Sequence, residues 1–310
     1  MSLKIIHTKN LRWIDIVGPE DSDLTYLKEH FKFHPLDFED IITPSIRTKI
    51  DEYPAYHFIV LLFPYYSKEN NEIRSVEVDF LIGPDYVITI HNGKMKTLNN
   101  LVHNAQQYDQ TRNAMMMQGS GFLLFTILEA LFKRSSPILD HINREVLSAE
   151  KNVFQLDIKT LEKLSELKKN IIIYRRIVKM HRYVLNKILH SSNDYLKFKD
   201  HKTYFQDLIE YGENIWNVLS SDKESVESFE ETNQSLGTHR INDILQVLTV
   251  LSVVLAALNL ITNILVFMER TNIEENYGLS NDLYLISFIT GFMFVVTITM
   301  LYYFRKRRWL

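Results

Sequence analysis

Hydrophobic and polar residues follow three patterns along the chain, and each predicts a different kind of structure. Up to about residue 115, short β-branched and aromatic runs such as LRWIDIVG, AYHFIVLLFPYY and VEVDFLIGPDYVITIHN predict strands. The stretch DSDLTYLKEHFKF has helical spacing and an acidic first turn, and Gly83, Pro84 and Asp85 predict a turn between strands. We therefore expect a cytoplasmic α/β domain over residues 1–118.

The second pattern is helical and begins at about residue 120. FLLFTILEALFKRSSPILDHINREVLSAEKNVF predicts one long helix, kinked or restarted at Pro137, and a partner helix follows a turn near residues 154–157. Proline usage changes at the same point, because all seven prolines lie between Pro19 and Pro137. We expect an antiparallel pair of long helices over residues 119–200.

A single uninterrupted helix is predicted from about Lys202 to the end of the first long apolar run. No proline breaks it, and Gly212 and Gly237 are its only weak points. About 65 helical residues would reach roughly 100 Å. Such a helix cannot bury its faces alone, so we expect residues 201–243 to form the stalk of an oligomer.

The third pattern consists of two apolar runs, residues 244–267 and 283–304, each long enough to cross a bilayer core of about 30 Å as a helix. The intervening residues 268–282 are acidic, whereas Arg240 precedes the first run and the tail 305–310 is basic. Basic flanks stay on the cytoplasmic side. We expect a multi-pass protein of the cytoplasmic membrane with both termini inside and the acidic loop outside.

Polar and small residues recur along one face of the first apolar run at steps of three and four. This stripe contains Asn242, Leu245, Thr249, Ser252, Ala256, Asn259 and Asn263. Asparagine is costly in hydrocarbon unless it meets water or a hydrogen-bonding partner, so the stripe should not face lipid. Two interpretations are open: a helix-packing seam, or the wall of a water-filled pore made by several copies. Three asparagines in one span favour the pore.

Five segments follow one another along the chain: FHPLDFEDIITPSIRTKIDEYPAYHFIVLLFPYY, FLIGPDYVITIHN, TYFQDL, NDILQVLTVLSVV and the terminal KRRWL. In these segments, and in their order and spacing, the chain resembles the CorA family of divalent-cation transporters. The matching positions of the first segment are His34, Pro35, Leu36, Glu39, Asp40, Arg47, Lys49, Glu52 and Tyr53. The resemblance implies a homopentameric funnel in which the first span lines the pore.

Several residues acquire roles through this resemblance. Asn242, Leu245 and Leu248 match a cytoplasmic throat whose apolar side chains form a constriction, and Asn259 matches a polar pore position. Asn263 falls where the family carries a small residue. Asp207 matches a carboxylate of a regulatory divalent-ion site between subunits, for which the loop of residues 69–72 is the candidate partner.

The chain departs from the family at its Gly-Met-Asn signature, because Val266, Phe267 and Met268 stand there and Gly-Met-Asn occurs nowhere. Mg²⁺ dehydrates reluctantly, so a filter that binds it through its water shell needs polar groups that Val266 and Phe267 lack. We expect Asn259 and Asn263 to form an alternative filter. Four acidic residues at the outer mouth would concentrate cations there: Glu269, Glu274, Glu275 and Asp282.

Composition and motifs narrow the function further. The chain has no cysteine, no phosphate-binding glycine loop and no nucleophile elbow, and its formal net charge is −3, so we expect neither an enzyme nor a nucleic-acid partner. The expected function is a homopentameric channel or transporter that passes Mg²⁺, Zn²⁺, Co²⁺ or Ni²⁺ down its gradient, without a prosthetic group. The alternative is a non-conducting membrane scaffold or sensor with the same fold.

Overall fold

The computed structural model describes residues 3–43, 47–155, 157–191, 201–271 and 279–306. Beyond residue 264, the side chains of residues 265, 268–271, 279–286, 289 and 301 also lie outside the description. The chain forms two compact units, residues 1–230 and 231–310. The long helix α7, Lys202–Thr271, contributes to both units.

One mixed sheet forms the centre of the first unit. Within the described ranges its strands are β1 (Leu3–His7), β2 (Arg12–Val17), β3 (Lys49–Glu52), β4 (His57–Ser67), β5 (Glu72–Ile82) and β6 (Tyr86–His91), in the spatial order β1-β2-β6-β5-β4-β3. The β2–β6 pair is parallel, and the other neighbours are antiparallel. β4 and β5 form an 11-residue hairpin ladder from His57↔Ile82 to Ser67↔Glu72.

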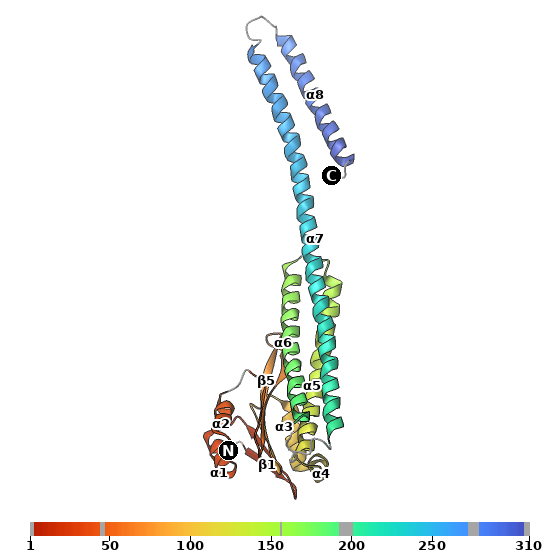
Figure 1. Ribbon diagram of the computed structural model, residues 1–310. Coiled ribbons are helices and arrows are strands. Elements are labelled where there is room, and N and C mark those ends of the chain that lie inside the picture. Colours follow the sequence, from red (N-terminus) through yellow and green to blue (C-terminus); the bar gives the residue numbers. More distant parts are fainter. Residues whose placement is uncertain (1–2, 44–46, 156, 192–200, 272–278, 307–310) are drawn as a thin grey trace. The chain divides into compact units, whose positions relative to one another are not determined.

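Helices cover both faces of this sheet (Figure 1). On one face lie α1 (Asp21–His30) and α2 (Pro35–Ile42), and on the other lie α3 (Lys96–Gln107), α4 (Asp109–Met116), α5 (Ser120–Asn152) and α6 (Ile158–Leu189). Alternation along the strands supplies both cores, because side chains at successive positions point to opposite faces. In β4, for example, Phe58 packs toward α1 and α2, whereas Ile59 packs toward the α5 side.

The long helices α5, α6 and the first half of α7 share a further core, to which Ile73 of β5 also contributes. Ile142 and Val146 of α5, Tyr174 of α6, and Ile215 and Leu219 of α7 belong to this core and are buried. Pro137 does not end α5, which continues as one helix of 33 residues. In the turn before Pro137, the Tyr174 hydroxyl donates to the Ser135 carbonyl at 3.0 Å.

The predicted strands, the turn at Gly83–Asp85 and the long helices are all present. α7 runs without a break for 70 residues, close to the predicted length, and the turn between α5 and α6 lies where it was expected. Edge strands β1 and β3 and helices α2, α3 and α4 were not predicted individually. The segment boundaries expected from composition stay predictions.

Candidate functional site

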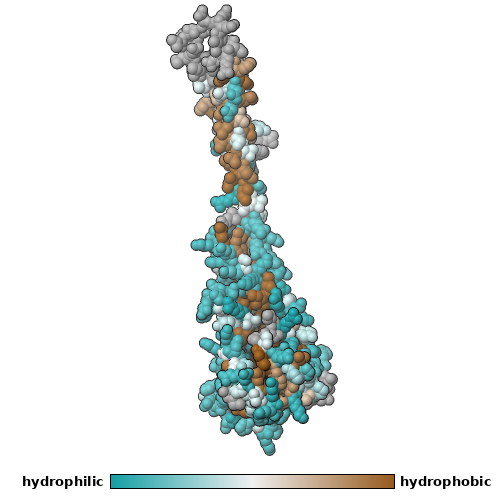
Figure 2. Space-filling view, turned by 90° about the vertical axis from the view of Figure 1, so that its left-hand side faces the viewer, coloured by the Kyte–Doolittle hydropathy of each residue, from teal (hydrophilic) through white to brown (hydrophobic). Residues whose placement is uncertain are grey.

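The second half of α7 is a long apolar stretch. By length and composition, Lys202–Ile264 qualifies as a helix that could cross a membrane, and only 11% of its most apolar window is buried. Figure 2 shows that its surface is mostly hydrophobic, with a few paler and hydrophilic residues. The α4–α5 pair meets the same criterion only if two helices at 110° count as one span, and α5 is a core helix of the first unit. The apolar stretch of α7 is therefore the candidate site.

One face of this stretch is covered within the second unit. Val250 and Val254 are buried at 2% and 7% exposure, and Ala257, Leu258 and Ile261 on the same face are partly buried. α8 (Leu279–Lys306) runs back alongside this part of α7 and has a matching partly buried stripe: Met293, Val296, Thr297, Met300 and Phe304. The periodicity of both stripes is that of two packed helices. The α7–α8 contact thus uses the aliphatic side of α7.

The predicted polar stripe lies on the face that α8 leaves open. Asn242, Thr249, Ser252, Ala256, Asn259 and Asn263 are all exposed. The hydroxyls are satisfied within the helix, since Thr249 donates to the Leu245 carbonyl at 2.7 Å and Ser252 donates to the Leu248 carbonyl at 2.9 Å. The amides of Asn259 and Asn263 have no hydrogen-bond partner within the part of the chain that the structure describes.

Apolar residues frame this stripe at both ends. Leu245 and Leu248 are 53% and 55% exposed at its N-terminal end, and Val266 and Phe267 are 45% and 69% exposed at its C-terminal end. α7 stays helical to Thr271. The backbone carbonyls near Val266 therefore lie inside a regular helix, where the amide four residues later is their usual partner.

The remaining residues that were predicted to lie at the outer mouth are outside the described side chains. This applies to Met268, Glu269, Glu274, Glu275 and Asp282. The role of the four acidic residues at the outer mouth consequently stays a prediction. The same holds for Met268, the third residue in place of Gly-Met-Asn.

Asp207 lies on an exposed face of α7 in the first unit. Its charge contributes to raising the pKa of Lys133, although the Glu129 carboxylate that accepts from Lys133 at 2.7 Å is the main cause. The candidate partner Glu72 is occupied within the same chain, where Lys169 donates to it at 2.7 Å. Among the described residues, no group of three or more histidine, aspartate or glutamate side chains could hold a metal ion. A site at Asp207 would need ligands from another subunit.

Three basic residues of α6 have specific partners on α7. Lys168 donates to Glu230 at 2.6 Å, Arg182 lies 3.3 Å from Glu213, and the Arg175 guanidinium stacks 4.4 Å from the Trp216 ring. These contacts join α6 to α7 within the first unit. The sequence did not predict these contacts, because the partners lie more than 30 residues apart along the chain.

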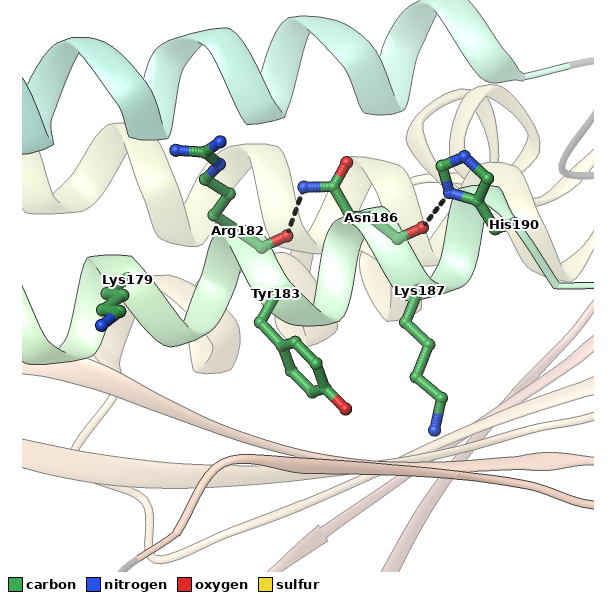
Figure 3. A pocket seen from close by; sticks show the side chains of 6 residues that line it. All are labelled: Lys179, Arg182, Tyr183, Asn186, Lys187 and His190. Atoms are coloured by element: carbon green, nitrogen blue, oxygen red, sulfur yellow. Dashed lines mark hydrogen bonds between the residues drawn. The ribbon is translucent and has the colours of Figure 1, made fainter.

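A small hollow of about 450 Å³ lies on this basic face of α6 (Figure 3). Its polar groups are engaged elsewhere: Asn186 donates to the Arg182 carbonyl at 2.9 Å, and Lys187 donates to the Ile50 carbonyl at 2.9 Å. Arg182 points toward α7, whereas Tyr183 and Lys187 point toward the strands. Because these groups diverge, the hollow does not form a catalytic constellation.

Two buried groups of the first unit were not predicted from the sequence. Burial raises the pKa of Asp79 well above its ordinary value, and the nearby Glu77 carboxylate adds to this effect. Asp15 accepts from the Thr89 hydroxyl at 2.6 Å and lies 3.2 Å from His91 Nε2, with all three residues buried. For both Asp79 and Asp15, the only indication in the sequence was an aspartate within an otherwise largely apolar strand.

The chain is similar over nearly its whole length to known cation transporters. The family model described as "CorA-like Mg2+ transporter protein" matches residues 8–306. The "Cobalt/magnesium transport protein CorA" of Thermotoga maritima is 24% identical and covers 96% of this chain and 83% of its own length. The protein of the same name from Methanocaldococcus jannaschii is 22% identical, with coverage of 97% and 92%.

Solved structures share the fold. The complete structure of the CorA magnesium transporter from Methanocaldococcus jannaschii superposes with a TM-score of 0.76 at 20% identity, covering 97% of this chain and 92% of that chain. The full-length CmaX protein gives a TM-score of 0.67 at 12% identity, with coverage of 94% and 88%. The match of the family model over residues 8–306 shows that this chain belongs to the family of CorA-like Mg²⁺ transporter proteins, which are membrane transporters and not enzymes.

Proposed function

We propose that this protein is a membrane channel that passes divalent cations down their electrochemical gradient through a pore lined by the polar stripe of α7. One observation carries the proposal: Asn259 and Asn263 lie on an exposed face of an apolar helix, opposite the side that α8 covers. An amide in hydrocarbon requires water or another polar group. A water-filled lumen satisfies every amide of a ring at once.

Five copies of the chain form this pore in our proposal. Membership of the CorA-like family supports an oligomer, and the exposed stripe of one copy needs equivalent stripes to enclose a lumen. Residues 283–304 form a second span, so that the acidic loop of residues 268–282 lies outside and both termini lie in the cytoplasm. Arg305 and Lys306 at the end of α8 support this orientation.

The gate and the filter occupy different levels of the same stripe. Rings of Leu245 and Leu248 constrict the cytoplasmic end and close the pore by excluding water. Rings of Asn259 and Asn263, one helical turn apart, hold a hydrated cation in place of the filter that Val266 and Phe267 cannot provide. This arrangement suits Mg²⁺, which keeps its waters, and it also accepts Zn²⁺, Co²⁺ or Ni²⁺.

Regulation by the transported ion follows from Asp207 in our proposal. Its exposed position allows a carboxylate of a neighbouring subunit to share a divalent cation with it. Removal of the cation would free the subunits to move relative to each other and would open the leucine gate.

Uptake into liposomes tests the proposal directly. The purified chain is reconstituted with a metal-sensitive dye inside the liposomes, and Mg²⁺, Zn²⁺, Co²⁺ and Ni²⁺ are added outside in separate runs. We expect flux of at least one ion, and a protein mass in detergent of about five times 36.7 kDa. No flux above empty liposomes under imposed voltage and pH gradients would instead support the non-conducting scaffold.

A further inference from the structure

A second cavity, which the transport proposal does not use, lies in the first unit. Its volume is about 940 Å³, and it is bounded by the β4–β5 hairpin, the loop between β6 and α3, and the middle of α5. Buried apolar side chains form part of its lining, including Val76, Met95 and Leu131. A volume near the upper end of the usual range for small-molecule sites, with an apolar floor and a polar rim, is suited to a metabolite.

The rim of the cavity is strongly basic. Lys68, Arg74, Lys94, Lys96 and Arg134 line it, and Glu69 is the only carboxylate among its lining residues. Lys68, Lys94, Lys96 and Arg134 form no ion pair with any other described residue, whereas Arg74 lies 3.5 Å from Glu72. By comparison, the basic residues Lys168, Lys169 and Arg182 of α6 all have carboxylate partners. Unpaired cations that line one hollow produce a positive potential that attracts anions.

The backbone beside the cavity adds to this potential. α3 begins at Lys96 with no side-chain cap and no acidic residue in its first turn. The preceding loop is held in place because Lys94 N–H donates to the Asn92 side chain at 3.1 Å and the Asn99 amide donates to the Gly93 carbonyl at 2.9 Å. The positive end of the α3 dipole therefore lies next to Lys94 and Lys96 in a fixed position.

Aromatic groups lie at the same cavity. The rings of Tyr66 and His141 both line it and meet edge to face, with centroids 4.5 Å apart. A site that combines cations, a helix N-terminus and aromatic rings offers contacts to a phosphate chain and to a flat ring. Free inorganic phosphate would use only a small part of the volume.

We propose that this cavity binds a polyphosphate anion, with Lys94, Lys96 and Arg134 as its main ligands. Two sources supply this chemistry: a nucleoside triphosphate, or an inorganic polyphosphate chain. Lys94 comes from the β6–α3 loop, Lys96 from the first turn of α3 and Arg134 from α5, so the bound anion would link the edge of the sheet to the long helix. The proposal does not depend on transport, because binding is measured without a membrane gradient.

Isothermal titration calorimetry of the full-length protein in detergent tests this site. The probes are ATP, inorganic triphosphate and inorganic phosphate, each with EDTA so that no divalent cation bridges ligand and protein. We expect ATP and triphosphate to bind about tenfold or more tightly than phosphate. Tighter binding of ATP than of triphosphate would assign a contact to the nucleoside, whereas equal binding would assign the site to the phosphate chain alone.

Charge-reversal variants separate the cavity from general surface charge. Arg134→Glu and the double variant Lys94→Glu/Lys96→Glu should each weaken triphosphate binding about tenfold or more. Lys179→Glu is the matched control, since Lys179 is an exposed, unpaired lysine on α6 within the described chain, and it should leave binding unchanged. Circular dichroism confirms folding, and Arg134→Glu tests the site alone if the double variant fails to fold. Absence of binding at millimolar ligand, or equal weakening by Lys179→Glu, would overturn the proposal.

Discussion

Acidification should destabilise the first unit through His181, whose imidazole is buried between α6 and the sheet. Its Nε2 lies 2.6 Å from the Leu62 carbonyl, to which it donates, and the rings of Phe63 and Phe132 lie within 5.0 Å of the imidazole centroid. Burial in this apolar setting lowers the pKa of His181 from 6.5 to about 4. The folded protein therefore resists protonation of this side chain.

The sign of the effect follows from the direction of the shift. The folded-state pKa is below the unfolded value, so between pH 6.5 and 4 the unfolded chain binds more protons. Stability is unaffected by this group above pH 6.5 and falls as the pH falls through the window. For these two pKa values, linkage gives a loss of about 2 kcal/mol between pH 7 and pH 5.

Urea unfolding followed by tryptophan fluorescence measures this loss, because Trp13 is fully buried in the same core as His181's neighbours. The raised pKa values of Asp79 and Asp222 change stability in the opposite direction, so the informative quantity is the difference between wild type and His181→Gln. Glutamine retains a donor but does not titrate. We expect His181→Gln to lose about 2 kcal/mol less than wild type between pH 7 and pH 5.

The exposed His103 provides the control, and His103→Gln should leave the pH dependence unchanged. Equal pH dependence in wild type and His181→Gln would refute the assignment of a neutral, buried imidazole. His57 has the same lowered pKa of about 4 for the same reason, so a residual loss in His181→Gln is expected.

Three further substitutions test the packing of the first unit by the same unfolding assay. Asn170→Leu removes the acceptor of the buried Ile73 amide (2.8 Å) and the donor to the Asn71 carbonyl (2.9 Å). It should lower the free energy of unfolding by about 2 to 3 kcal/mol, and a loss below about 0.5 kcal/mol would contradict these hydrogen bonds. Phe205→Ala empties a fully buried position at the start of α7 and should cost about 3 to 5 kcal/mol, unlike Gln206→Ala at the exposed neighbour. Gly212→Ala should stabilise α7 by up to about 1 kcal/mol, because alanine favours the helix and its Cβ would lie at an ordinary contact distance of 3.7 Å from Phe132. Destabilisation would show that the helices pack more closely than described.

The sequence was sufficient for features that depend on local periodicity. Alternation along AYHFIVLLFPYY predicts β4, the absence of proline after Pro137 predicts the uninterrupted α7, and steps of three and four place Asn259 and Asn263 on one face. These patterns work because neighbouring residues on one strand or helix have fixed directions relative to one another.

Features that depend on contacts between residues far apart in the chain could not be predicted from the sequence. The parallel pairing of β2 with β6 joins residues more than 70 positions apart, and the Lys168–Glu230 contact joins residues 62 positions apart. The cavity proposed to bind polyphosphate is lined by three separate segments, so no local run of basic residues in the sequence predicts it. The sequence also did not indicate which face of α7 is covered by α8. Both faces of the apolar stretch are long enough to pack against another helix.

Cation flux through Asn259→Ala tests whether the asparagine rings of α7 form the filter. The variant is reconstituted beside wild type and Thr262→Val, a control in the same helix whose hydroxyl already donates to the Leu258 carbonyl at 2.9 Å. We expect Asn259→Ala to remain oligomeric and to lose most of its cation flux, whereas Thr262→Val should conduct like wild type. Wild-type flux through an intact Asn259→Ala oligomer would contradict the filter proposed on the polar stripe of α7.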